Sequence, residues 1–114
     1  MFLLAISRER RWIADSGSTF HITGDPRLTF KFQPIPIEQS RLAIANGIPL
    51  NVLGKGSVNL IMHAQTDFLV TLHDVLLVEN MRFNLFSLHA GQRKQEIILD
   101  STGIHPFDCS LTFP

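Results

Sequence analysis

The sequence predicts an all-β domain, a small closed or partly open β-barrel with at most one short helix. Its apolar runs have the length of strands, turn residues separate them closely, and only one stretch has helical spacing. The chain has 114 residues, of which 45% are hydrophobic and nine are Phe. That is enough for one compact core and leaves little room for a second domain.

The first half of the chain is typical of short strands joined by turns. LTFKF, residues 28–32, alternates large apolar with polar residues, which predicts a half-buried strand. In RLAIANGIPLNV, residues 41–52, the dipeptide Asn46-Gly47 stands between two apolar runs. This pattern predicts a hairpin.

The strand pattern continues in the second half. In GKGSVNLIM, Gly54 and Gly56 indicate a bulge or tight bend before an apolar run. Further strands are expected in residues 67–78, 96–104 and 109–113.

One short helix is expected near residues 84–92. Leu85 and Leu88 are spaced for one helical face, and Gly91 limits the helix to a turn or two.

Composition narrows the range of functions. Ten basic and ten acidic residues cancel, whereas nucleic-acid binders carry a basic excess, so no direct nucleic-acid partner is expected. The apolar run 1–6 is too short for a signal peptide or a membrane helix, so we expect no membrane partner. The single Cys109 excludes an internal disulfide and fits an intracellular, cytoplasmic location. Five scattered histidines offer no metal-ligand spacing, so neither a metal nor a cofactor is expected.

WIADSGSTFHITGD, residues 12–25, carries the strongest candidate for chemistry. An apolar run leads directly into Asp15, although strands disfavour Asp and a buried carboxylate needs partners. Gly17 permits close backbone approach, and the Ser16 hydroxyl can stiffen the turn. Aspartic proteases need two such carboxylates sharing one proton. The simpler interpretation is a turn that ends a strand.

A second acidic turn does not supply the partner carboxylate. In ILDSTGI, residues 98–104, Gly103 follows Asp100 by three places rather than two, which is typical of a turn between strands. A triad of His21, Asp15 and a serine lacks the G-x-S-x-G elbow. The chain therefore has one catalytic-type Asp, and a protease active site would require two copies of the chain.

Four blocks of the sequence, taken together, resemble the protease region of copia-type retrotransposon Gag-Pol polyproteins. They span residues 12–104 in the family's order: WIADSGSTFHITGD, LAIANGIPLNVLGKGSV, LHDVLLVENMRFNLFSL and EIILDSTGI. The resemblance implies a retropepsin-like barrel over residues 12–105, with an N-terminal extension at 1–11 and a divergent tail at 106–114.

The resemblance also implies roles for particular residues. Asp15 would be the catalytic aspartate, with Ser16 and Gly17 completing its loop. Ser87 would lie where retropepsins carry a Gly that supports this loop. A flap over the substrate would be formed by the hairpin at Asn46 and Gly47, with Gly54 and Gly56 as further candidates.

Two functions follow as alternatives. The first is a homodimeric aspartic endopeptidase that processes its own Gag-Pol, in the cytoplasm or in virus-like particles. The second is a catalytically inactive or domesticated β-barrel that acts as a structural or interaction module. The oligomeric state distinguishes them, because a stable monomer cannot assemble the pair of carboxylates.

Overall fold

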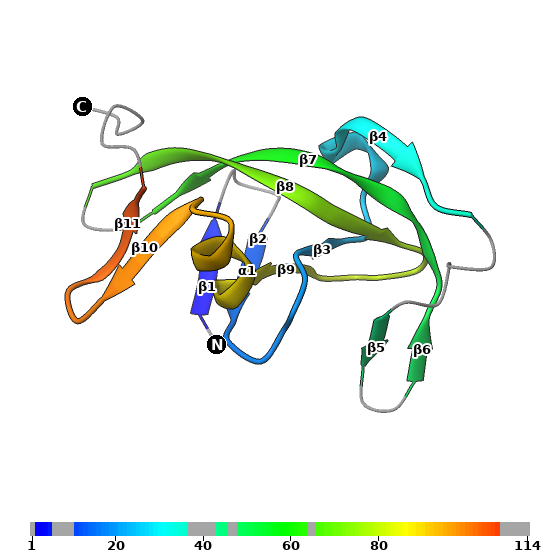
Figure 1. Cartoon of the computed structure of the whole chain (residues 1–114), viewed down its shortest axis with the longest axis horizontal. Helices are drawn as coiled ribbons and strands as arrows, with labels where there is room; N and C mark the ends of the chain where they lie inside the picture. Colours follow the sequence, from blue (N-terminus) through cyan, green and yellow to red (C-terminus); the bar gives the residue numbers. More distant parts are fainter. Residues whose placement is uncertain (1, 6–10, 37–42, 46–47, 64–65, 108–114) are drawn as a thin grey trace.

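The computed structural model describes residues 2–5, 11–36, 43–45, 48–63 and 66–107 (Figure 1). Its strands are β1 (Phe2–Ala5), β2 (Arg11–Asp15), β3 (Ile22–Thr23), β4 (Phe30–Pro34), β5 (Ala43–Ala45), β6 (Ile48–Leu50), β7 (Val52–Met62), β8 (Phe68–Val78), β9 (Asn84–Ser87), β10 (Ile97–Asp100) and β11 (Gly103–Pro106). Its helices are a 3-10 turn, η1 (Pro26–Leu28), and α1 (Leu88–Arg93). The predicted all-β class with a single short α-helix is confirmed for these residues.

Seven strands form the main sheet, in the order β1-β2-β9-β3-β8-β7-β4. The pairs β5–β6 and β10–β11 form separate two-stranded sheets. Figure 1 shows β7 and β8 as a long antiparallel ribbon across the molecule, with the β5–β6 hairpin projecting from one end. Because β1 and β4 stand at opposite edges of the order, the described sheet is not closed, and the domain is barrel-like rather than a complete barrel.

The core lies between this ribbon and the strands around β2 and β9. β8 alternates buried and less buried residues from Phe68 to Leu72, and all residues from Val75 to Val78 are buried. The change reflects a strand covered on one face at its start and on both faces at its end. The main buried cluster contains Trp12, Ala14, Val58, Leu60, Met62, Phe68, Val70, Leu72, Val75, Phe86, Leu88 and Ile97.

The strands that flank the predicted hairpin turn pair as expected, and the predicted bulge is present. β5 and β6 pair antiparallel with Ala45 opposite Ile48, as the hairpin prediction requires. Asn46 and Gly47 themselves lie outside the described residues. In β7 the register shifts at Gly54 and again after Gly56, which confirms the predicted bulge.

The predicted helix is displaced toward the C-terminus. Residues 84–87 form β9, which pairs in parallel with β2, and α1 begins only at Leu88. The placement of residues 84–87 in a helix was therefore wrong. In the sheet, β9 lies between β2 and β3, so the backbone of residues 84–87 has a hydrogen-bonded strand on each side. The spacing of Leu85 and Leu88 does not indicate these distant partners.

The half-buried strand predicted at 28–32 was also wrong in its details. Leu28 ends η1, and the residues of β4 are all exposed. Lys31 has a φ of 53°, and the pairing of β4 with β7 is irregular there, so the alternation of faces is interrupted. The N-terminal residues 2–5 form β1, which pairs with β2. The strand expected at 109–113 lies outside the described residues.

The close contact of β4 with β7 depends on Gly54. A Cβ atom there would lie 2.5 Å from the carbonyl oxygen of Gln33 and would overlap the Phe32 ring. We expect Gly54→Ala to lower the free energy of unfolding by about 1–3 kcal/mol, because a backbone atom must move. Gly56→Ala is the matched control, since its nearest neighbour would be 3.1 Å away. Denaturant unfolding of the two variants tests this, and equal stabilities would contradict it.

Candidate active site

Asp15 is the last residue of β2, and the chain turns directly after it. Its Oδ1 atom accepts a hydrogen bond of 2.8 Å from the backbone N–H of Gly17. Asp15 is partly exposed, whereas Ser16 and Gly17 are exposed. The turn therefore fixes the carboxylate at a strand end while leaving it accessible to solvent.

The segment after Asp15, residues 16–21, forms what we call the aspartate loop. β2 and β3 lie on opposite sides of β9, so the loop that joins them must cross the end of β9 (Figure 1). Ser87 is the last residue of β9 and stands opposite Asp15 in the parallel register. The aspartate loop thus passes over the point where β9 ends and α1 begins.

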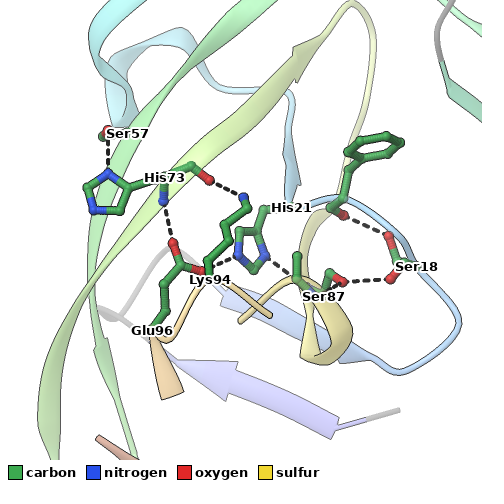
Figure 2. A network of polar contacts seen from close by, with 9 residues as sticks. Ser18, His21, Ser57, His73, Ser87, Lys94 and Glu96 are labelled. Carbon is green, nitrogen blue, oxygen red and sulfur yellow. Dashed lines mark hydrogen bonds and ion pairs between the residues drawn. The ribbon is translucent and has the colours of Figure 1, made fainter. Parts of the chain in front are cut away.

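Ser87 is fully buried and holds this loop at two points. Its hydroxyl donates to the carbonyl oxygen of Ser18 at 2.6 Å, and its backbone N–H donates to Nδ1 of His21 at 3.0 Å (Figure 2). The same hydroxyl oxygen accepts from the N–H of Ala90 at 2.9 Å and so caps α1. One side chain therefore connects the start of the helix with the aspartate loop.

His21 is the last residue of the aspartate loop and anchors it in the protein interior. The residue is fully buried, and its ring stacks on Phe86 with centroids 5.0 Å apart. Its Nε2 lies 2.7 Å from Oε1 of Glu96. Because Nδ1 accepts from Ser87, Nε2 carries the proton and donates to the carboxylate. Burial lowers the pKa of His21, an effect that the hydrogen bond to Glu96 partly opposes.

Glu96 is a buried acid that follows α1. Its second oxygen, Oε2, accepts from the backbone N–H of His73 in β8 at 2.6 Å. Lys94 donates from Nζ to the carbonyl oxygen of His73. Burial lowers the pKa of Lys94. Figure 2 shows how these contacts extend from β8 to the aspartate loop.

Two of the four residues predicted for the flap, Gly54 and Gly56, lie in the part of the chain that the structure describes. Gly54 and Gly56 are buried in β7, within the seven-stranded sheet, whereas β5 and β6 form a separate hairpin. With Asn46 and Gly47 outside the described residues, the flap stays a prediction that rests on this hairpin.

Asp100 is a turn residue, as its spacing to Gly103 predicted. It ends β10, and its Oδ1 accepts from the backbone N–H of Thr102 at 2.8 Å and from the hydroxyl of that residue at 2.6 Å. These hydrogen bonds lower its pKa. Gly103 has a φ of 124°, a backbone conformation that favours glycine.

Metal ligands and membrane-spanning helices are both absent from the part of the chain that the structure describes. No group of three or more His, Cys, Asp or Glu side chains there is arranged to hold a metal ion. Neither of its helices is long and apolar enough to cross a membrane.

A cavity of about 400 Å³ opens beside the end of the aspartate loop. Apolar side chains that include Phe20, Ile35 and Leu76 line it, together with charged groups of β7, β8 and α1. A cavity with apolar walls and a few charged groups can hold a side chain of a peptide.

The burial of His21 makes the stability of the fold depend on pH. A lowered pKa in the folded state means that the unfolded chain binds the additional proton more readily. We expect the free energy of unfolding to be greatest above the ordinary histidine pKa of 6.5 and to fall as the pH drops below it, through the folded pKa. Denaturant unfolding at a series of pH values measures this.

His89→Gln is the control for that titration, because His89 is exposed on α1. The variant should keep the pH dependence. Loss of the dependence in this variant, or a folded His21 that titrates above 6.5 by NMR, would contradict the assignment.

Comparison with known proteins places these residues in a family. The family model described as the Pol polyprotein beta-barrel domain matches residues 12–96, three quarters of the chain. The match begins just before Asp15 and ends at Glu96, so it encloses the whole network described above. No curated protein and no solved structure matches the chain significantly. On this match, the chain belongs to the Pol polyprotein beta-barrel domain family.

Proposed function

We propose that this chain is the aspartic endopeptidase domain of a copia-type retrotransposon polyprotein, active as a homodimer. One observation carries the proposal. Asp15 ends a strand in which Trp12 and Ala14 are buried, its carboxylate accepts from the N–H of Gly17, and it remains partly exposed. A carboxylate that is fixed but accessible is what general acid–base chemistry requires.

The chemistry needs a second carboxylate close to the first. Two such groups share one proton, so that one activates a water molecule while the other donates to the carbonyl oxygen of the peptide bond. The sequence contains the D-S-G pattern once, at Asp15, so a second copy of the chain supplies the other carboxylate. A reaction that needs one carboxylate protonated and the other ionised has a bell-shaped dependence of rate on pH.

The substrate in this proposal is a peptide segment of the chain's own Gag-Pol polyprotein. The β5–β6 hairpin serves as the flap that closes over it, and the reaction uses no metal or cofactor. Processing takes place inside the cell, in the cytoplasm or in virus-like particles.

The purified chain should cleave members of a peptide library between about pH 4 and pH 7. Because the site forms from two chains, the rate per chain should rise with protein concentration until dimerisation is complete. Sedimentation over the same concentrations measures the dimer directly. A chain that remains monomeric and cleaves nothing would favour the alternative, a catalytically inactive or domesticated structural module.

A further inference from the structure

We propose that His21 and Glu96 are positioning residues that hold the aspartate loop, and through it Asp15, in place. Neither residue reaches the reacting atoms in this proposal. They act through Ser87, which stands beside Asp15 in the sheet. The kinetic part of the inference rests on the proposed function, whereas the structural part does not.

The connection from His21 to Asp15 is short and continuous. Nδ1 of His21 accepts from the N–H of Ser87, and the hydroxyl of Ser87 donates to Ser18. Ser18 lies three residues after Asp15, and His21 ends the same loop. The loop is therefore attached to β9 at its middle and at its end. Displacement of either attachment would move the turn that sets the Asp15 carboxylate.

Glu96 determines how the His21 ring is oriented. One carboxylate oxygen accepts from His21 and the other from the N–H of His73. A carboxylate accepts on both oxygens, whereas an amide offers one acceptor and one donor. An amide in this place would direct its N–H₂ group at a donor, either at Nε2 of His21 or at the N–H of His73.

The attachment requires neutral His21. A second proton on Nδ1 would face the N–H of Ser87, so that two donors would meet in a buried space. The charged groups around the His21 ring have opposite effects on its protonation. Glu96 favours the protonated form, while Lys94 and Arg93 at the end of α1 disfavour it. Protonation in acid would therefore release the loop, which adds an acid limit to activity beyond the titration of the catalytic pair.

The first test is Glu96→Gln, with Glu79→Gln as its matched control. Glu79 is an exposed acid that accepts from the side chain of Asn51, away from the aspartate loop. We expect kcat of Glu96→Gln to fall about 100-fold, because misplacement of a catalytic group by about 1 Å has an effect of this size. KM should stay within about twofold, since substrate contacts are not removed. The acid limit of the pH profile should also move.

The control should retain wild-type values of kcat, KM and pH profile. Wild-type kinetics in Glu96→Gln, with a folded protein, would overturn the positioning role.

A second variant, Ser87→Ala, tests the same connection in case Glu96→Gln does not fold. Ser87→Ala removes the hydroxyl contact with Ser18 and the cap on α1 but keeps the N–H that donates to His21. We expect faster amide hydrogen exchange at Gly17 and a lower kcat. Ser101→Ala, an exposed serine in the β10–β11 turn, is its control and should change neither. Unchanged exchange at Gly17 in Ser87→Ala would contradict the proposed route to Asp15.

The structural part can be tested in a chain that cannot cleave. In Asp15→Asn, the ¹⁵N shifts of the His21 ring should show a proton on Nε2 and none on Nδ1 at neutral pH. A proton on Nδ1 would overturn the inference whether or not the wild type is a peptidase. Absence of cleavage by the wild type, with the predicted tautomer and loop exchange, would contradict only the proposed function.

Discussion

Asp15→Asn should lower the rate of peptide cleavage by at least about 1,000-fold, because an amide cannot take up the proton that general base catalysis moves. The side chain keeps nearly the same shape, and its amide oxygen can still accept from the N–H of Gly17. The fold and its thermal unfolding should therefore change little. Cleavage of a peptide that the wild type cuts, followed by mass spectrometry, gives the rate.

Asp100→Asn is the matched control for this substitution. Asp100 is also an acid at the end of a strand, and its carboxylate also accepts from a backbone N–H two residues further on. It lies in the β10–β11 turn rather than beside Ser87. Cleavage by Asp100→Asn should equal that of the wild type. Cleavage by Asp15→Asn near the wild-type rate would place the chemistry elsewhere.

Mixed dimers test whether two chains share the site. When equal amounts of wild-type and Asp15→Asn chains associate at random, only about a quarter of the dimers contain two aspartates. The rate should then fall to that fraction of the value for wild type at the same total concentration. A fall to one half would show instead that each wild-type chain works by itself.

The parts of the fold that the sequence predicts are those with local causes. The hairpin at residues 43–50 follows from a dipeptide suited to a tight turn, and the bulge in β7 follows from two glycines. The position of Asp15 at a strand end follows from the apolar residues before it and Gly17 after it. Each pattern lies within a few residues of the feature it predicts.

The features that the sequence did not predict depend on residues far away in the chain or on local backbone conformation. Residues 84–87 form a strand because β2, about 70 residues earlier, offers a parallel partner. Phe30 and Phe32 are exposed because Lys31 adopts a left-handed backbone conformation, which the alternation of residue types does not indicate. Propensity and periodicity describe a segment alone and cannot include the sheet into which it is inserted.

The same limit applies to the candidate site. His21 and Glu96 are 75 residues apart, and no motif joins them. His21 stands in a polar stretch, and Glu96 precedes an apolar run as an ordinary surface acid would. The one signal in the sequence was Ser87, which the resemblance placed under the aspartate loop, and its hydroxyl does contact Ser18 there.

Glu96→Ala should destabilise the fold more than Gly54→Ala does. The side chain of Glu96 is almost completely buried, and its removal leaves two donors, Nε2 of His21 and the N–H of His73, without their acceptor. A buried donor left without its acceptor costs about 1–3 kcal/mol, so the two donors together cost about 2–6 kcal/mol. We expect a decrease of this size in the free energy of unfolding, measured by denaturant titration at pH values above about 7, where His21 is neutral in both states.

The matched control for this loss is Glu79→Ala, at an exposed acid whose side chain has water as an alternative partner. Its free energy of unfolding should change by less than about 1 kcal/mol. In Glu96→Ala, water that enters the space left by the carboxylate would restore one acceptor at most, so the loss should remain well above that of the control. Equal stabilities of the two variants would show that the His21–Glu96 pair does not hold β8, α1 and the aspartate loop together.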